Sequence, residues 1–209
     1  SAASDVYKRQ DLIFVETLIK QLAIRNSSAA EIGIEGLIET VEGLSNVDKI
    51  AQSSEKLEAL VLGMGDYAAS QRMRINTIGD VSSEAGDIWQ YPRYRLIVAC
   101  HANGINPIDG PYADVKDITG LKQDTKKTSL IGMMGKWAIH PDQVTPITEA
   151  FTPGKDVVST ARKQKTAYEK GLSEGLGSVS VDGVMVDAAN AKTIDELLAL
   201  NELYEKTDS

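Results

Sequence analysis

Cysteine, positive charge and long apolar runs are all scarce in this chain of 209 residues. The single cysteine, Cys100, excludes a disulfide framework and favours a reducing compartment, so the cytoplasm is the expected location. The net charge of -8 and the missing basic clusters argue against a nucleic-acid surface. No apolar run approaches the roughly 20 residues that span a bilayer, and the N-terminus lacks the basic-then-apolar order of a signal peptide. We therefore expect neither nucleic-acid nor membrane partners.

The first ten residues have the character of a non-native extension. The string DVYKRQ is what a sequencing-library transposon end encodes when it is translated. We therefore predict that residues 1–10 are library-derived and exclude them from the prediction of the fold. The native chain is expected to begin upstream of Asp11.

Strand-like and helix-like patterns alternate from Asp11 onward. Stretches rich in Ile, Leu and Val are typical of buried parallel strands and are expected at 31–39, 57–66, 105–111 and 135–141. Helical spacing predicts helices at 11–23, 45–57, 92–104 and 117–133, with a long polar loop at 67–90. Ser45 or Asn46 is the expected N-cap of the second helix. Four strand-then-helix units require an α/β fold with a parallel sheet and right-handed crossovers.

The C-terminal residues 152–209 differ in kind. They comprise a charged amphipathic stretch at 156–175, an alternating stretch around Asp182 and Gly183, and a final helical stretch at 188–206. Asp-Gly between two alternating segments is the strongest short signal for a hairpin. The sequence therefore predicts a helix, a hairpin and a helix as an appendage to the α/β part at 11–151.

Polar residues end each of the four expected strands. They are Glu39, Asp66, Asp109 and His140. In parallel α/β folds the catalytic groups sit at the carboxyl ends of the strands. Mg²⁺ takes one or two carboxylates plus substrate oxygens and water, so Glu39 and Asp66 are the predicted metal ligands. The alternative is that each carboxylate caps a helix or pairs with Arg72 or Arg74.

Separated motifs resemble, in order, the HpcH/HpaI aldolase and citrate lyase family, and within it the malyl-CoA lyase branch. They are IGIEGLIETVEGL continuing to GMGDYAAS, then PIDGPYADVKDITGL, GKWAIHPDQ and DGVMVD. The resemblance implies a TIM (β/α)₈ barrel, which takes about 250 residues and eight strands. With four strand units, the sequence predicts an N-terminally truncated fragment: the C-terminal half of a barrel at 11–151, inactive alone, followed by a helical lid with a small hairpin at 152–209.

The resemblance also implies the chemistry. Glu39 and Asp66 match the family positions that bind Mg²⁺, or Mn²⁺ in its place. The substrate is a coenzyme A thioester, malyl-CoA or β-methylmalyl-CoA, which is cleaved reversibly to acetyl-CoA or propionyl-CoA and glyoxylate. Asp187 matches an acid/base residue that a neighbouring subunit's lid contributes, which implies a homo-oligomer, a trimer or a hexamer. Asp187 is alternatively the N-cap of the last helix.

Further residues are implied to contact the coenzyme or the oxo acid. The amides around Gly65 are expected to receive the oxo-acid carboxylate, because glycine lets the backbone approach a ligand closely. Lys136, His140 and Pro141 match a family signature near bound coenzyme A. A buried structural role is the alternative for His140, and Asp109 is expected to order its surroundings rather than to bind.

Other functions stay open at this stage. Citramalyl-CoA lyase and a citrate lyase β-subunit-like protein are alternatives within the same chemistry. A non-catalytic coenzyme A-binding paralogue is an alternative of another class, against which the joint presence of Glu39, Asp66 and Asp187 argues. An aldolase that acts on a free 2-oxo acid is disfavoured by the DGVMVD extension.

Overall fold

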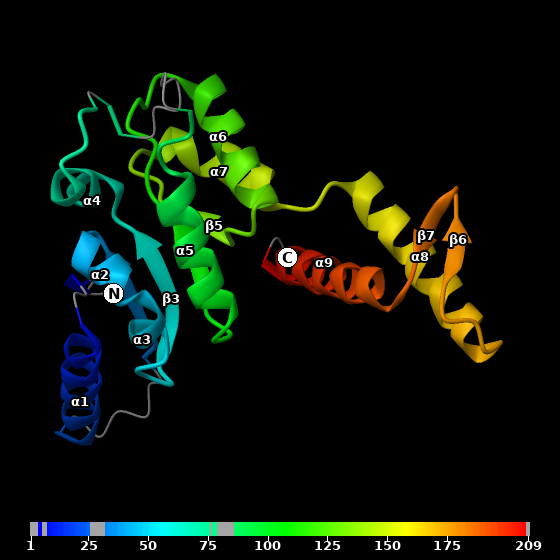
Figure 1. Cartoon of the computed structure of the whole chain (residues 1–209), viewed down its shortest axis with the longest axis horizontal. Helices are drawn as coiled ribbons and strands as arrows, with labels where there is room; N and C mark the ends of the chain where they lie inside the picture. Colours follow the sequence, from blue (N-terminus) through cyan, green and yellow to red (C-terminus); the bar gives the residue numbers. More distant parts are fainter. Residues whose placement is uncertain (1–3, 6–7, 26–31, 76, 79–85, 208–209) are drawn as a thin grey trace. The chain divides into compact units, whose positions relative to one another are not determined.

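The computed structural model describes residues 4–5, 8–25, 32–75, 77–78 and 86–207. The chain forms two compact units, residues 1–151 and residues 152–209 (Figure 1). The first unit contains a parallel sheet, and the second contains an antiparallel hairpin between two long helices.

A parallel sheet of five strands, in the order β1-β2-β3-β4-β5, forms the centre of the first unit. The strands are β1 (Ser4–Asp5), β2 (Ile34–Ile38), β3 (Leu57–Leu62), β4 (Asn106–Asp109) and β5 (Gly135–Lys136). Each strand from β2 onward pairs in parallel with the strand that precedes it in the chain. The predicted α/β fold with a parallel sheet is confirmed. Strand β1 falls within residues 1–10, whose non-native origin stays a prediction.

Helices connect these strands and cover the sheet. They are α1 (Arg9–Arg25), α2 (Val41–Ser45), α3 (Val47–Ala51), α4 (Met64–Gln71), α5 (Gln90–His101), α6 (Ile118–Leu130) and α7 (Pro141–Phe151). Strands β2 and β3 are almost entirely buried, which explains their continuous apolar sequence. Ile38, Leu60 and Leu62 are fully buried, and burial of such a side chain stabilises the fold by roughly 1.5–3 kcal/mol.

The connection after β3 differs from the prediction. The predicted loop at 67–90 does not begin at Tyr67, because that residue lies inside α4. Met64, Tyr67 and Ala68 recur at helical spacing and are buried. The strand prediction over 57–66 was therefore too long, since the apolar run turns from a strand into a helix at Gly63, which is the N-cap residue of α4.

The predicted helix at 45–57 is also wrong in its bounds. Two short helices, α2 and α3, occupy this region, and α2 begins directly after Thr40. The Thr40 hydroxyl accepts a hydrogen bond from the Gly43 N–H at 3.0 Å, so Thr40 rather than Ser45 caps this helix. Asn46 is the N-cap residue of α3 but makes no capping bond with its side chain.

The second unit contains the predicted helix, hairpin and helix. They are α8 (Lys155–Ser173), the antiparallel strands β6 (Val179–Val181) and β7 (Val184–Val186), and α9 (Ala188–Thr207). Asp182 and Gly183 join the strands with φ angles of 52° and 80°, the left-handed pair that a tight hairpin turn requires. A small core holds the unit together and includes Ala161, Tyr168, Val181, Val186 and Ile194.

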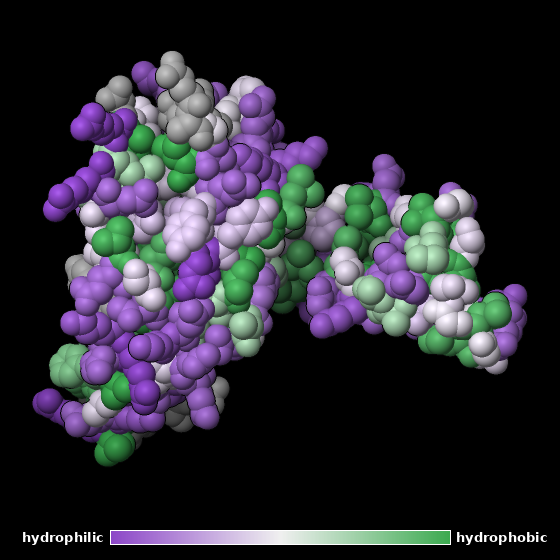
Figure 2. Space-filling model, viewed as in Figure 1, coloured by the Kyte–Doolittle hydropathy of each residue, from purple (hydrophilic) through white to green (hydrophobic). Residues whose placement is uncertain are grey.

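Polar side chains cover most of the first unit on the face that Figure 2 shows, with apolar residues scattered among them. Scattered apolar residues are normal for a folded protein surface. No helix within the described residues is long and apolar enough to cross a membrane.

Candidate functional site

Glu39 directly follows β2 and lies against the end of β3. Its side chain is buried, with only 8% of the residue exposed. The Gly63 N–H donates a hydrogen bond to the Ile38 carbonyl at 2.9 Å, which joins the two strand ends. A Cβ at Gly63 would lie 2.5 Å from the Glu39 Cβ and 3.1 Å from its Oε2. Only glycine therefore leaves room for the Glu39 carboxylate beside the end of β3.

Asp66 follows β3 within the first turn of α4. Met64 and Tyr67, on either side of it, are buried, whereas Asp66 is exposed. The N–H groups of this turn have no partner within the helix and favour a carboxylate or a bound anion. The Val41 N–H donates to the Ser70 hydroxyl at 3.1 Å, so the segments that follow β2 and β3 are in contact. The structure thus places the predicted metal ligands at the carboxyl ends of neighbouring strands.

The oxygen donors at this edge fit a small divalent cation. Within the described part of the chain, no group of three or more His, Cys, Asp or Glu side chains forms a ready cluster for a metal. Mg²⁺ does not need one, since it binds through one or two carboxylates and keeps water or substrate oxygens as its other ligands. The absence of a Cβ at Gly63 leaves room for the Glu39 side chain at the start of α4, so the donor set at this edge is the two carboxylates of Glu39 and Asp66.

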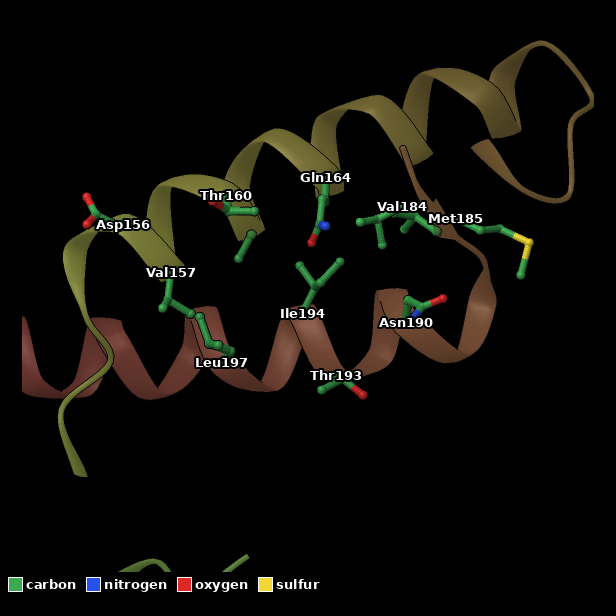
Figure 3. A pocket seen from close by; sticks show the side chains of 12 residues that line it. Asp156, Val157, Thr160, Gln164, Val184, Met185, Asn190, Thr193, Ile194 and Leu197 are labelled. Atoms are coloured by element: carbon green, nitrogen blue, oxygen red, sulfur yellow. The ribbon is translucent and has the colours of Figure 1, made fainter. Parts of the chain in front are cut away.

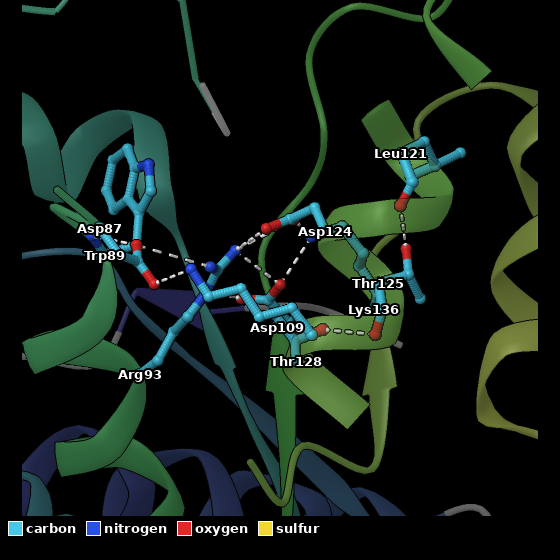
Figure 4. A network of polar contacts seen from close by, with 10 residues as sticks. Asp87, Trp89, Arg93, Asp109, Leu121, Asp124, Thr125, Thr128 and Lys136 are labelled. Carbon is cyan, nitrogen blue, oxygen red and sulfur yellow. Dashed lines mark hydrogen bonds and ion pairs between the residues drawn. The ribbon is translucent and has the colours of Figure 1, made fainter. Parts of the chain in front are cut away.

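Four charged side chains form a buried network at the ends of β4 and β5 (Figure 4). Arg93 donates through Nε to Asp109 Oδ1 and through Nη2 to Asp109 Oδ2, both at 3.0 Å. Its Nη2 also donates to Asp124 Oδ1 at 3.0 Å. The Lys136 ammonium donates to Asp109 at 2.6 Å and to Asp124 at 2.8 Å. All four side chains have 0% exposure, so two cations balance two carboxylates out of contact with water.

Two neighbouring carboxylates favour the charged form of Arg93 inside this network. Burial disfavours the charge on Arg93, but the carboxylates of Asp109 and Asp124 outweigh it and raise the pKa of Arg93. Asp87 lies at the margin, where its Oδ1 is 4.0 Å from Arg93 Nη1 and its Oδ2 is 2.7 Å from the Lys127 ammonium. Burial opposes ionisation of Asp87, but Lys127 and the Trp89 N–H lower its pKa overall.

Arg93 and Asp124 were not predicted from the sequence as part of any site. The signal for both is a charged residue on the apolar face of a helix. Arg93 lies on the same helical stripe as Leu96, Ile97 and Cys100, and Asp124 follows Leu121 by three residues. Lys136 was predicted to lie near coenzyme A, and the structure gives its ammonium two carboxylate partners inside the protein. A role of Lys136 in binding coenzyme A stays a prediction.

His140 and Pro141 lie where β5 leads into α7. His140 is exposed, so the alternative of a buried structural role is wrong. Its Nδ1 accepts a hydrogen bond from the Asp142 N–H at 3.2 Å. Pro141 is the first residue of α7, a position that proline favours because its missing N–H is not needed there. Both residues are accessible to a ligand, and coenzyme binding by them stays a prediction.

Asp187 caps α9 in the second unit. Its Oδ1 accepts hydrogen bonds from the N–H groups of Ala189 at 2.9 Å and Asn190 at 3.1 Å. The Asn190 side-chain oxygen accepts in return from the Asp187 N–H at 3.2 Å. The N-cap alternative for Asp187 is therefore confirmed. Both side-chain bonds use Oδ1, so among the described residues Oδ2 is not committed to the cap, and an acid/base role stays a prediction.

A groove of about 490 Å³ lies beside this cap, between α8, α9 and the hairpin (Figure 3). Its lining is mostly apolar, with a few polar side chains such as Gln164 and Asn190. Val186 and Asn190 line it from either side of Asp187 in the sequence. The capped carboxylate thus lies next to an apolar depression within this unit.

Solved structures of similar fold support this architecture. A citrate lyase from Burkholderia xenovorans LB400 aligns over 98% of this chain and 64% of its own, with a TM-score of 0.80 and 20% identity. The protein CitE from Mycobacterium tuberculosis, solved in complex with magnesium, acetoacetate and coenzyme A, aligns over 81% of this chain and 61% of its own. Its TM-score is 0.68 and its identity is 21%. At these identities the likeness shows the fold.

Closer sequence relatives define the family. The L-malyl-CoA/beta-methylmalyl-CoA lyase of Rhodobacter capsulatus is 33% identical over 211 aligned positions, which cover 96% of this chain. The chain spans 64% of the length of that relative. The family model described as HpcH/HpaI aldolase/citrate lyase matches residues 5–141, a range that includes Glu39, Asp66 and the buried network. The chain therefore belongs to the HpcH/HpaI aldolase/citrate lyase family.

Proposed function

We propose that the full-length protein that contains this chain is a Mg²⁺-dependent carbon-carbon lyase. It would cleave malyl-CoA or β-methylmalyl-CoA reversibly to acetyl-CoA or propionyl-CoA and glyoxylate. The observation that carries the proposal is the contact of Glu39 with the end of β3 across Gly63, three residues before Asp66. The 33% identical relative named for this activity supports the choice of substrate.

Glu39 and Asp66 would hold the cation. The buried Glu39 is fixed against Gly63, whereas the exposed Asp66 is presented on the first turn of α4. Magnesium, when bound, supplies a Lewis acid for the carbonyl oxygen of the two-carbon oxo acid. The backbone amides at Gly65 and Asp66, at the start of α4, would receive the carboxylate of that oxo acid.

Asp187 would move the proton at the carbon next to the thioester. In the condensation direction its carboxylate takes a proton from the methyl group of acetyl-CoA, and in cleavage it returns that proton. The cap bonds to Oδ1 orient the carboxylate and leave Oδ2 for this transfer. We propose that Asp187 acts in the site of a neighbouring subunit, in a trimer or hexamer, with residues 152–209 as the lid.

The remaining predicted residues would contact the coenzyme, and missing strands would complete the barrel. His140 and Pro141 are exposed at the start of α7 and are proposed to lie against coenzyme A. Lys136, which ends β5, is also proposed to lie near coenzyme A, and its bonds to Asp109 and Asp124 would hold this strand end in place. The sheet is proposed to be half of a (β/α)₈ barrel, whose other strands lie outside this chain.

The test is release of glyoxylate from malyl-CoA by the full-length protein, with and without Mg²⁺. Glu39→Gln removes a proposed ligand, and Glu42→Gln is its matched control, because Glu42 lies nearby on the exposed side of α2. The proposal expects turnover that needs Mg²⁺, is lost in Glu39→Gln and is kept in Glu42→Gln. Coenzyme A binding without turnover of any thioester would instead identify a non-catalytic paralogue. Release of pyruvate from citramalyl-CoA in preference to glyoxylate from malyl-CoA would replace the substrate.

The proton-transfer role has its own pair of variants. Asp187→Asn keeps an N-cap of comparable quality, because Asn and Asp cap helices about equally well, but removes the base. Asp182→Asn changes an exposed carboxylate five residues earlier that pairs with Lys163. We expect Asp187→Asn to lower kcat by at least roughly 100-fold with an unchanged melting temperature, and Asp182→Asn to leave kcat unchanged. Equal kcat in both variants would remove Asp187 from the mechanism.

A further inference from the structure

The buried network of Arg93, Asp109, Asp124 and Lys136 joins four consecutive elements at the carboxyl edge of the sheet. Asp109 ends β4 and Lys136 ends β5, and the two residues are register partners across these strands. Arg93 lies in the first turn of α5, and Asp124 lies in α6. A helix that precedes or follows a parallel strand has its N-terminus on this same edge. The network therefore lies at the same edge of the sheet as Glu39 and Asp66.

Stability alone does not account for this network. Removing four charges from water is costly, and apolar side chains of similar volume often give equal or greater stability at such a place. The charged groups instead fix the relative orientation of the elements that carry them. The guanidinium of Arg93 binds Asp109 with two parallel bonds at 3.0 Å, a fork that fixes the angle as well as the distance. The end of β4 is thus held in one orientation.

A direct packing contact carries this orientation to the proposed metal site. Gly110 follows Asp109, and a Cβ there would overlap the Leu62 carbonyl oxygen and lie 2.7 Å from Met64 Sδ. The end of β4 therefore lies directly against the end of β3 and the first residue of α4. Met64 is fully buried and precedes Asp66 by two residues. A shift of β4 would move the turn that presents Asp66.

We propose that the Arg93–Asp109–Asp124–Lys136 network positions Asp66 for binding of Mg²⁺, through the contact of Gly110 with Met64. The inference rests on the proposed function, since it takes Glu39 and Asp66 as the metal ligands. None of the four network residues touches the cation. They act as positioning residues, and their removal lowers metal affinity by displacing the first turn of α4.

The test is Mg²⁺ binding to the full-length protein, measured by isothermal titration calorimetry without substrate. The double variant Asp124→Asn/Lys136→Met removes one anion and one cation, so the buried charge stays balanced and the Arg93–Asp109 pair remains. Its matched control is Asp48→Asn/Arg95→Met, which removes an exposed ion pair of 2.9 Å between α3 and α5. We expect Mg²⁺ affinity to fall roughly 10- to 100-fold in the first double variant and to be unchanged in the control.

Melting temperatures of the variants, measured without metal, distinguish loss of the positioning role from loss of the fold. If the first double variant melts near the wild-type temperature and binds Mg²⁺ with wild-type affinity, the inference is wrong. If that variant does not fold, Arg93→Lys decides, because it keeps the charge and loses the fork. Arg93→Lys is then expected to fold and to bind Mg²⁺ several-fold more weakly, and wild-type affinity in it overturns the inference.

Glu39→Gln in the same titration distinguishes failure of the proposed metal site from failure of the positioning role of the network. If Glu39→Gln binds Mg²⁺ like the wild type, the metal site itself is misplaced and the proposed function fails. If Glu39→Gln loses Mg²⁺ binding while the folded network variants keep it, the metal site stands and the positioning role alone is rejected. Loss of Mg²⁺ affinity in both Glu39→Gln and the folded network variants supports the metal site and the positioning role of the network.

Discussion

Substitution of Lys136 by methionine isolates the contribution of one charge in the buried network. The ammonium donates hydrogen bonds to Asp109 at 2.6 Å and Asp124 at 2.8 Å, and its side chain has no exposure. Methionine keeps most of the aliphatic volume, so the change leaves little cavity. It leaves one cation, Arg93, facing two carboxylates without access to water.

The expected cost follows from that imbalance. Removing one partner of a buried ion pair costs about 3–5 kcal/mol, because the remaining charge is left uncompensated. We therefore expect Lys136→Met to lower the free energy of unfolding by about 3–5 kcal/mol. The exposed pair of Lys122 and Glu149, at 3.5 Å, offers a comparison. Lys122→Met should cost at most about 1 kcal/mol, since exposed ion pairs contribute little.

Urea unfolding of the full-length protein, followed by tryptophan fluorescence, measures both changes. Trp89 is fully buried and lies one helical turn before Arg93, so its emission reports on this region. Adding Asp124→Asn to Lys136→Met restores the charge balance and should recover part of the loss. The reasoning is refuted if Lys136→Met costs no more than Lys122→Met, or if the second substitution makes the loss larger.

Three further predictions concern single residues. Burial raises the pKa of the Cys100 thiol to about 12, so Cys100 should resist thiol reagents in the native protein at pH 8, and fast labelling of the native protein would contradict this. The contribution of the protonated thiol to the free energy of unfolding should be present below pH 9.0 and disappear as the pH rises toward about 12. Thr40→Ala removes the cap bond of α2 and should cost about 1 kcal/mol in urea unfolding, whereas no change would mean that water replaces the bond. Gly63→Ala should abolish Mg²⁺ binding in calorimetry, because its Cβ would lie 2.5 Å from the Glu39 Cβ; wild-type affinity would argue against Glu39 as a ligand.

The fold class and most elements could be predicted because they depend on local pattern. The order of apolar runs and helical stretches predicts a parallel sheet, and Asp182-Gly183 predicts the hairpin turn. The boundaries could not be predicted where one apolar run serves two elements. LEALVLGM reads as a single strand, yet Met64 already belongs to α4, because Gly63 breaks the extended backbone and Tyr67 supplies the next buried position.

The candidate site was predicted unevenly for a similar reason. Glu39 and Asp66 could be nominated as metal ligands because the sequence shows where apolar strand-like runs end, and their role as ligands stays a prediction. Arg93 and Asp124 were missed because their partners are distant in the chain, 16 residues from Arg93 to Asp109 and 31 residues from Arg93 to Asp124. A charge on an apolar helix face predicts burial with a partner, but the partner's identity depends on how the helix packs. The cap bonds of Asp187 were predictable as an alternative because they are local.

The two groups of carboxylates at this edge differ in what a cation would have to displace. The sequence gives Asp109 the same standing as Glu39 and Asp66, since all three end expected strands. A metal ion at Asp109 would compete with Arg93 at 3.0 Å and Lys136 at 2.6 Å, both inside a site that water does not reach. Asp66 is exposed, and Gly63 leaves room for the Glu39 side chain beside the end of β3. Arg93 and Lys136 thus neutralise Asp109 and Asp124, and under the proposed function a divalent cation would bind at the ends of β2 and β3 instead.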